Sequence, residues 1–402
     1  MTSSTTPATL PADHFGLYIH IPFCVRKCHY CDFASQPLGG DASLSDRYLD
    51  ALVAEAALRR AEFSRPVHSV FIGGGTPTTL TGAQLRRLWQ EVIAPFPLTD
   101  DVEVSIEANP GTLSDDVLDG LRALPLTRVS LGMQSAQPDE LTRLGRIHTQ
   151  AQVEEAVAAL RALGVPQLNL DLMYALPGQT PAHWRDTLDA ALALAPDHLS
   201  LYALIVEDGT PLAASVAAGL LTLPSEDEEE EMARWTATAL HAAGFQHYEV
   251  SNAARPGARC RHNLGYWLGR DYLGLGAAAT STIGAVRWRN QAAVTDYLAV
   301  QPAMAYIERL SAADHLLERI MLGLRLRDGF DLGAAEATCG RTLSSLAGET
   351  LAALMQEELL ELADGTLRLT AHGYPLANYV VTRLMAASDA QAFREPCRGE
   401  KS

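Results

Sequence analysis

The segment Cys24-Val25-Arg26-Lys27-Cys28-His29-Tyr30-Cys31 brings three cysteines together in the spacing C-x3-C-x2-C. Three thiolates can each bind one iron of a [4Fe-4S] cubane, so the fourth iron keeps no protein ligand. An open metal position allows a small molecule to be activated there. The segment therefore predicts a [4Fe-4S] cluster on Cys24, Cys28 and Cys31, with S-adenosylmethionine on the open iron.

A zinc site, a redox dithiol and three unrelated thiols are the alternatives for this segment. Tetrahedral zinc needs a fourth ligand, and His20 and His29, although near, do not supply the usual ligand spacing. A thioredoxin-type pair begins a helix and leaves the third cysteine without a role. The spacing alone leaves these alternatives open, and the rest of the chain favours the cluster.

Strand-like and helix-like segments alternate from residue 15 to about residue 205. This alternation predicts βαβ units with six parallel strands, so we expect an α/β fold with a partial, TIM-like (β/α)6 barrel. Functional side chains of such a barrel gather at the carboxyl ends of its strands. The expected strands are 17–21, 69–73, 103–107, 128–132, 167–172 and 198–204, with helices such as 44–61 and 81–93 between them.

The residues that follow these strands are suited to holding a polar ligand. The second strand ends in Gly73-Gly74-Gly75-Thr76-Pro77, and glycines let backbone N–H and C=O groups approach a ligand closely. Glu107, Gln134 and Asp171 end three later strands. Each feature alone is as well explained by a turn or a helix cap. Together they predict a polar cage at one mouth of the barrel.

Composition limits the classes of protein to which the chain can belong. Its 402 residues, 48% of them hydrophobic, suffice for one large core and a smaller one. A net charge of −17 repels phosphate backbones and argues against nucleic-acid binding. Residues 1–13 lack the features of a secretory signal, and no apolar stretch is long enough to span a bilayer. We therefore expect a cytoplasmic protein without a transmembrane segment. Peripheral contact with a membrane stays open.

The pattern changes beyond residue 205. An acidic run, 226–231, begins a helix and is typical of a solvated helix face. Helices at 316–326 and 343–357 and a hairpin around Asp364-Gly365 predict a small, winged-helix-like α+β domain. The expected division is a flexible N-terminus (1–14), the barrel (15–245), a connector (246–311), the C-terminal domain (312–386) and a disordered tail (387–402).

The stretch Tyr18-Ile19-His20-Ile21-Pro22-Phe23-Cys24, the cysteine segment and the glycine run resemble the oxygen-independent coproporphyrinogen oxidase group of radical-SAM proteins. The resemblance covers nearly the whole chain, including the C-terminal domain typical of that group. It implies that Tyr18 lies near the cluster and that the turn 176–180 lies near S-adenosylmethionine. The residues that it implies for binding S-adenosylmethionine are Tyr18, Gly74, Gly75, Thr76, Glu107, Gln134, Arg146, Asp171 and Ala203.

Two features separate the chain from the coproporphyrinogen dehydrogenases of this group. Those enzymes have a further cysteine two residues after the third ligand, where this chain has Phe33, and a longer N-terminal extension. The segment His262-Asn263-Leu264-Gly265-Tyr266-Trp267 is instead similar to the H-N-x-x-Y-W pattern of the HemW-type heme chaperones. This resemblance implies heme binding, with His262 offered to the iron and Tyr266 and Trp267 to the porphyrin face.

The leading hypothesis is a heme chaperone that carries the cluster and S-adenosylmethionine and delivers heme to acceptor proteins, for example of the respiratory chain. The alternative is an oxygen-independent coproporphyrinogen III dehydrogenase, which Phe33 argues against. Another radical enzyme, such as a methyltransferase, would leave the H-N-x-x-Y-W segment unexplained. Cys260, just before that segment, is a further candidate for heme contact, although a buried thiol there would be ordinary. The sequence leaves open whether a radical reaction is catalysed.

Overall fold

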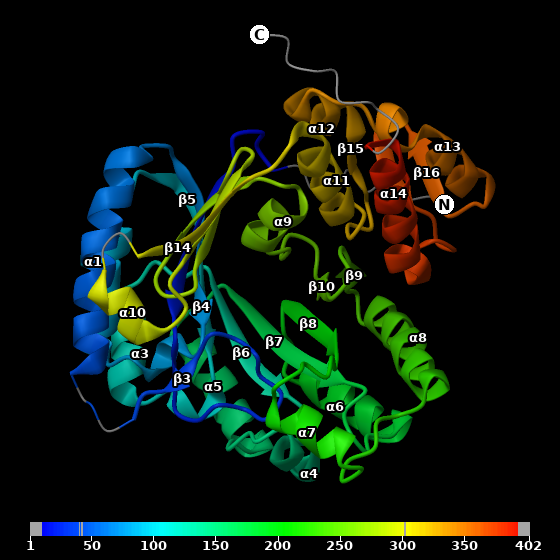
Figure 1. Cartoon of the computed structure of the whole chain (residues 1–402). Helices are drawn as coiled ribbons and strands as arrows, with labels where there is room; N and C mark the ends of the chain where they lie inside the picture. Colours follow the sequence, from blue (N-terminus) through cyan, green and yellow to red (C-terminus); the bar gives the residue numbers. More distant parts are fainter. Residues whose placement is uncertain (1–9, 40, 42, 301–302, 393–402) are drawn as a thin grey trace.

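The structure is a computed structural model, and it describes residues 10–39, 41, 43–300 and 303–392. A strongly curved sheet of 12 strands forms its centre (Figure 1). The strands of this sheet are β1 (Phe15–Ile21), β4 (Val67–Gly74), β5 (Leu98–Ala108), β6 (Arg128–Gln134), β7 (Gln167–Tyr174), β8 (His198–Ala203), β9 (Gln246–His247), β10 (Asn252–Ala254), β11 (Asp271–Leu275), β12 (Thr280–Ile283), β13 (Val286–Asn290) and β14 (Met304–Arg309).

Six neighbouring strands of the sheet, β1, β4, β5, β6, β7 and β8, pair in parallel in this order. Each contains or overlaps an expected strand, so the predicted α/β class with a partial barrel is confirmed. One further parallel strand was missed, as were the antiparallel strands β9, β10, β12, β13 and β14. Residues 271–275, expected as part of the connector (246–311), form β11 and pair in parallel with β1. The sheet then continues on both sides through antiparallel strands.

Side chains of the parallel strands alternate between the helical layer and the barrel interior. Leu17, Ile19 and Ile21 of β1 are fully buried in the main core. Tyr18 and His20 lie between them in sequence and point to the opposite face. The helices around the sheet are α1 (Leu44–Glu62), α2 (Gly82–Arg87), α3 (Asp115–Arg122), α4 (Pro138–Arg143), α5 (Gln150–Ala162), α6 (Pro181–Ala193), α7 (Pro211–Ala217), α8 (Glu226–Ala242), α9 (Arg261–Trp267) and α10 (Val294–Ala299).

A local sequence signal explains where helix α8 begins. The acidic run begins α8, where Ser225 and Glu228 form a reciprocal capping box. The single helix expected at 81–93 is instead α2 followed by a π-helical turn, η2 (Leu88–Ile93), a geometry that propensity does not reveal.

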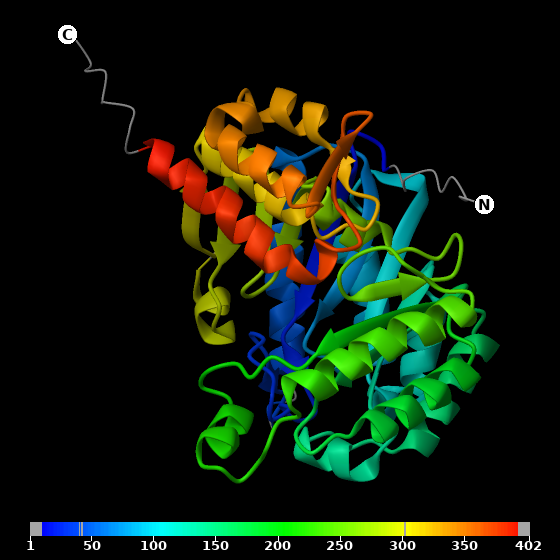
Figure 2. The ribbon, with the colours of Figure 1, turned by 90° about the vertical axis from the view of Figure 1, so that its right-hand side faces the viewer.

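The C-terminal part of the chain, drawn in orange and red in Figure 2, has a second core of its own. Asp364 and Gly365 both have positive φ, at 51° and 79°, as a type I′ turn requires, and they join the two strands of the expected hairpin. The elements of this part are α11 (Ala312–Gly323), β15 (Phe330–Asp331), α12 (Leu332–Cys339), α13 (Leu343–Gln356), β16 (Leu360–Ala363), β17 (Thr366–Leu369), η4 (Tyr374–Leu376) and α14 (Ala377–Ala392).

The two ends that were expected to be flexible are described in part. His14 is 1% exposed, and its Nε2 lies 3.1 Å from Ser69 Oγ of β4, whereas residues 1–9 lie outside the described residues. Helix α14 continues to Ala392, inside the segment expected to be a disordered tail, and the rest of that segment also lies outside the described residues.

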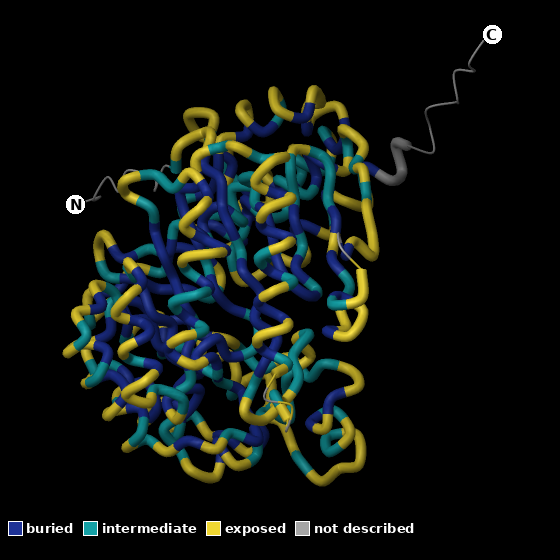
Figure 3. Tube along the Cα trace, turned by 90° about the vertical axis from the view of Figure 1, so that its left-hand side faces the viewer, coloured by how far each residue is buried: buried dark blue, intermediate teal, exposed yellow. Residues whose placement is uncertain are grey.

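Figure 3 shows that segments inside the molecule are buried, whereas many turns at the surface are exposed. Among the described helices, none has the length and apolarity required to cross a bilayer.

Candidate functional site

The three cysteines of the C-x3-C-x2-C segment line one cavity of about 340 Å3, at the carboxyl ends of the parallel strands. Cys24 ends the short strand β2 (Phe23–Cys24), and its Sγ accepts a hydrogen bond from Thr76 Oγ1 at 3.7 Å. Cys28 Sγ accepts one from Arg146 Nη1 at 3.5 Å. The Arg146 guanidinium can therefore offset the negative charge of bound thiolates.

The three thiols of the segment are available as metal ligands. Cys24, Cys28 and Cys31 are free thiols that are only partly buried. In the described part of the chain, no three His, Cys, Asp or Glu side chains are placed to hold one metal ion together. A cubane needs one thiolate at each of three separate irons.

Two histidines that were considered as zinc ligands instead hold the cysteine loop in place. His20 Nε2 donates to the carbonyl of Ala34 at 3.0 Å, so its Nδ1 is the acceptor for the Tyr18 hydroxyl at 2.9 Å. Burial lowers the pKa of His20, which favours this neutral form. His29 Nδ1 lies 3.0 Å from the carbonyl of Arg143 in α4. No local sequence signal predicts these long-range contacts.

The glycine run packs too tightly to admit side chains. Gly74 has φ +109°, and its N–H donates to Glu107 Oε2 at 3.0 Å. A Cβ atom on Gly74 would lie 2.4 Å from the His20 ring, and one on Gly75 would lie 2.6 Å from the carbonyl of Phe23. These glycines therefore allow the strand end to approach the cysteine loop closely.

Substitution of Gly74 tests this packing. We expect Gly74→Ala to lower the free energy of unfolding by about 2–4 kcal/mol, from the positive φ and the clash with His20 together. We also expect at least about tenfold weaker S-adenosylmethionine binding by equilibrium dialysis. Gly164→Ala is the matched control, because Gly164 has φ +85° but a Cβ there would meet nothing within 4 Å. Equal losses in the two variants would contradict the packing argument.

Two partly buried carboxyl groups, those of Glu107 and Asp171, face the same cavity. Burial, followed by the charge of Asp171, raises the pKa of Glu107 to about 8, although the Gly74 N–H lowers it. Burial also raises the pKa of Asp171, which accepts hydrogen bonds from Ser130 Oγ at 2.9 Å and Asn169 Nδ2 at 2.8 Å. Neither carboxyl group forms an ion pair with a described residue. A cationic ligand would favour their ionised forms.

A hydrogen-bond chain joins the cysteine loop to the other predicted residues. Arg146 Nη2 donates to Asn109 Oδ1 at 2.8 Å and to the carbonyl of Gly132 at 2.6 Å. Asn109 Nδ2 donates to Thr76 Oγ1 at 2.7 Å. Sequence reasoning missed Asn109, although it follows the expected strand 103–107 closely. The predicted residues that line the cavity are Cys24, Cys28, Cys31, Gly74, Gly75, Thr76, Glu107, Gln134, Arg146, Asp171 and Ala203.

Two positions predicted near this ligand lie outside the cavity lining. Tyr18 is one of them, and its hydroxyl binds the His20 ring that packs against Gly74. The turn 176–180 is the other. It leads into α6, and Gln179 Nε2 donates to the buried Glu140 at 2.9 Å.

The H-N-x-x-Y-W segment forms helix α9, and the structure places it at the opposite end of the barrel from the cysteines. The His262 ring packs against Gly16, near the start of β1. A Cβ atom added to Gly16 would lie 3.2 Å from this ring. The Glu103 carboxylate seats the helix by accepting the backbone N–H groups of Arg261 at 2.9 Å and His262 at 3.0 Å. The two predicted sites are therefore separate.

His262 is enclosed by its neighbours. It is 2% exposed, with Nδ1 lying 2.9 Å from Ser69 Oγ and Nε2 lying 2.9 Å from the Tyr266 hydroxyl. Burial, followed by the charge of His14, lowers its pKa to about 3. Both ring nitrogens are engaged, so binding of iron requires one of these contacts to break.

The other members of this candidate site differ in accessibility. Cys260 is buried, its thiol donates to Glu103 Oε1 at 3.5 Å, and burial raises its pKa to about 12. Trp267 ends α9, is partly exposed and borders a small cavity beside the C-terminal part.

Comparisons with known proteins give matches to two parts of the chain and to nearly its whole length. Residues 18–191 match the radical SAM superfamily, and residues 310–376 match the HemN C-terminal domain. Heme chaperone HemW of Mycobacterium tuberculosis is 40% identical over 389 residues, covering 94% of this chain and 96% of the relative. Heme chaperone HemW of Bacillus subtilis is 35% identical, covering 90% and 97%. The structure of coproporphyrinogen III oxidase (HemN) from Escherichia coli superposes with a TM-score of 0.81 at 27% identity, covering 94% and 91%.

Proposed function

We propose that this chain, which belongs to the HemW family of the radical SAM superfamily, binds heme and passes it to acceptor proteins. The observation that carries the proposal is full-length similarity, at 35–40% identity, to relatives named heme chaperones. The H-N-x-x-Y-W segment supports it, because this segment forms one ordered helix with a partly exposed tryptophan.

We propose that the cavity at the strand ends holds a [4Fe-4S] cluster and S-adenosylmethionine. Cys24, Cys28 and Cys31 would hold the cluster, which when bound supplies an electron for reductive cleavage of the sulfonium. Arg146 lies against the Cys28 sulfur and offsets the thiolate charge. The carboxyl groups of Glu107 and Asp171, which line the cavity, suit the cationic groups of the nucleotide.

We propose that heme contacts Trp267 first and that His262 reaches the iron in a second step. Trp267 offers a flat apolar face, whereas His262 is buried with both nitrogens engaged. Release of the Tyr266 hydroxyl would free Nε2 without displacing the Ser69 contact. Because the Tyr266 hydroxyl competes with iron for Nε2, this contact suits a carrier that must also give heme up.

The alternative, coproporphyrinogen III dehydrogenase, draws support from the superposition on the E. coli oxidase. Phe33 argues against it, since it replaces the additional cysteine and its side chain borders the cavity with 63% exposure. Heme titration of the anaerobically purified chain, beside a decarboxylation assay with reductant and S-adenosylmethionine, separates the two. We expect saturable heme binding and no protoporphyrinogen. Appreciable protoporphyrinogen would reject a chaperone role as the full account.

Replacing His262 by alanine tests the second step of the proposed heme binding, in which His262 reaches the iron. We expect His262→Ala to weaken heme binding about tenfold or more and to change the Soret band, because an axial ligand is lost. Cluster absorbance should stay intact, since His262 lies at the other end of the barrel. Tyr266→Phe is the informative partner: it frees Nε2 from its hydrogen bond and should bind heme at least as tightly as the parent chain. Unchanged heme affinity and spectrum in His262→Ala would remove His262 as ligand.

A further inference from the structure

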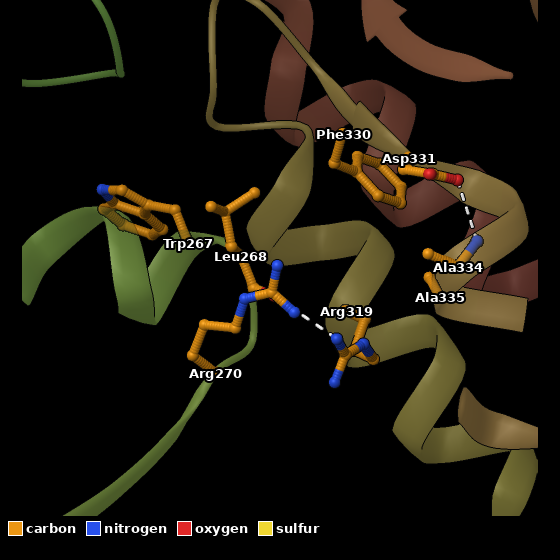
Figure 4. A pocket seen from close by; sticks show the side chains of 8 residues that line it. All are labelled: Trp267, Leu268, Arg270, Arg319, Phe330, Asp331, Ala334 and Ala335. Carbon is orange, nitrogen blue, oxygen red and sulfur yellow. Dashed lines mark hydrogen bonds between the residues drawn. The ribbon is translucent and has the colours of Figure 1, made fainter. Parts of the chain in front are cut away.

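A small cavity of about 60 Å3 lies between the end of α9 and the C-terminal part of the chain (Figure 4). Trp267 and Leu268 border it on one side, and Phe330 of β15 borders it on the other. Two arginines, Arg270 and Arg319, complete the wall. The cavity therefore lies between a tryptophan of the candidate heme segment and two arginine side chains, in largely apolar surroundings.

The two arginines are close and incompletely paired. Figure 4 shows their guanidinium groups turned toward each other, and burial followed by the charge of Arg319 lowers the pKa of Arg270. Arg270 Nη1 donates to the carbonyl of Ala12 at 3.2 Å, and Arg319 Nη1 donates to that of Gly269 at 2.9 Å. The Nε atoms of both are buried without an acceptor in the described part of the chain. Neither arginine forms an ion pair with a described carboxylate.

The carboxylates near the pair do not neutralise it by direct contact. Asp331 borders the cavity but is exposed, and its Oδ1 accepts the backbone N–H of Ala334 at 2.8 Å as the N-cap of α12. The charges of Asp13 and Asp271 raise the pKa of Arg270, but neither carboxylate forms an ion pair with it. Within the described part of the chain, the arginine pair therefore lacks a direct counterion.

Backbone contacts explain where each arginine lies, but not how the two charges are balanced. Arg270 binds the carbonyl of Ala12. Arg319 binds the last carbonyl groups of the α9 turn, which explains its position. Neither contact offsets the repulsion between the two neighbouring like charges, which apolar side chains partly shield from water. An anion between the two guanidinium groups would remove that repulsion and could accept hydrogen bonds from their N–H groups.

We propose that this cavity binds a carboxylate group attached to a flat apolar ligand, namely a propionate arm of heme, with the macrocycle outside the cavity against Trp267. This inference rests on the proposed heme-carrier function. The size of the cavity agrees with it, because about 60 Å3 admits a carboxylate, whereas whole drug-sized ligands occupy roughly 300 Å3 or more. The pair is locally basic in a chain of net charge −17, which otherwise repels a dianionic porphyrin.

The test compares hemin with hemin dimethyl ester, whose propionates are esterified, by titration of the full chain. We expect the parent chain to prefer hemin by about tenfold, as a charge-assisted hydrogen bond predicts. Arg270→Gln should abolish this preference while it keeps affinity for the ester. Arg319→Lys keeps the positive charge but loses the planar donors, so it should reduce the preference. Arg234→Gln is the matched control, because the Arg234 side chain is 70% exposed on α8, outside the cavity lining.

The outcomes separate this inference from the function on which it rests. If hemin and its ester bind the parent chain equally, or if Arg270→Gln keeps the full preference for hemin, the carboxylate cavity is wrong and heme binding stands. If neither porphyrin binds the parent chain, the proposed function fails, and the inference falls with it.

Discussion

Replacing Cys28 by alanine is expected to abolish the cluster. Iron content after anaerobic reconstitution should fall from about four per chain to near zero, and the broad visible absorbance of the cluster should disappear. The reason is that Cys24, Cys28 and Cys31 line the same cavity, and a cubane with one open iron needs all three thiolates. Iron and sulfide analysis together with Mössbauer spectroscopy measure the effect.

Another free cysteine provides the control for this experiment. Cys339 is 8% exposed in the C-terminal core, so Cys339→Ala should keep the full iron content and lose only some packing. Normal four-iron binding in Cys28→Ala would contradict the ligand assignment. Zinc in place of iron in the reconstituted parent chain would contradict the cluster itself.

The parallel core of the barrel was predictable because strand and helix signals alternate there. Strand β11 was not, because glycines within and beside it are typical of loops. The structure gives the reason for one of them: a Cβ on Gly274 would lie 2.2 Å from the carbonyl of Thr280 in the neighbouring strand β12. Glycine is thus required by a contact between strands, which local sequence patterns do not report.

The gathering of polar side chains at the strand ends was predictable because parallel strands bring their carboxyl ends to one mouth. Strand order alone places Glu107 of β5 beside Gly74 of β4, where the Gly74 N–H donates to the Glu107 carboxylate at 3.0 Å. The enclosure of His262 could not be predicted in this manner. Its partner Ser69 lies 193 positions away in the chain, and only the folded barrel brings the two together.

Glu103 connects the barrel to the candidate heme helix, and its removal should have the second largest effect. Its carboxylate accepts two backbone N–H groups at the start of α9 and lies 3.9 Å from Arg128, whose side chain is 2% exposed. Glu103→Ala would leave the Arg128 charge buried without this partner. We expect the free energy of unfolding to fall by about 3–5 kcal/mol and heme affinity to fall with it.

The conservative variant separates the charge from the hydrogen bonds. Glu103→Gln keeps one oxygen acceptor for the α9 backbone but loses the negative charge beside Arg128, so we expect an intermediate loss of stability. Cluster content and S-adenosylmethionine binding should stay unchanged in Glu103→Gln, because their residues lie at the opposite mouth of the barrel. Denaturant unfolding and heme titration measure the two effects. If Glu103→Ala kept both the stability and the heme affinity of the parent chain, the seating of α9 by this carboxylate would be wrong.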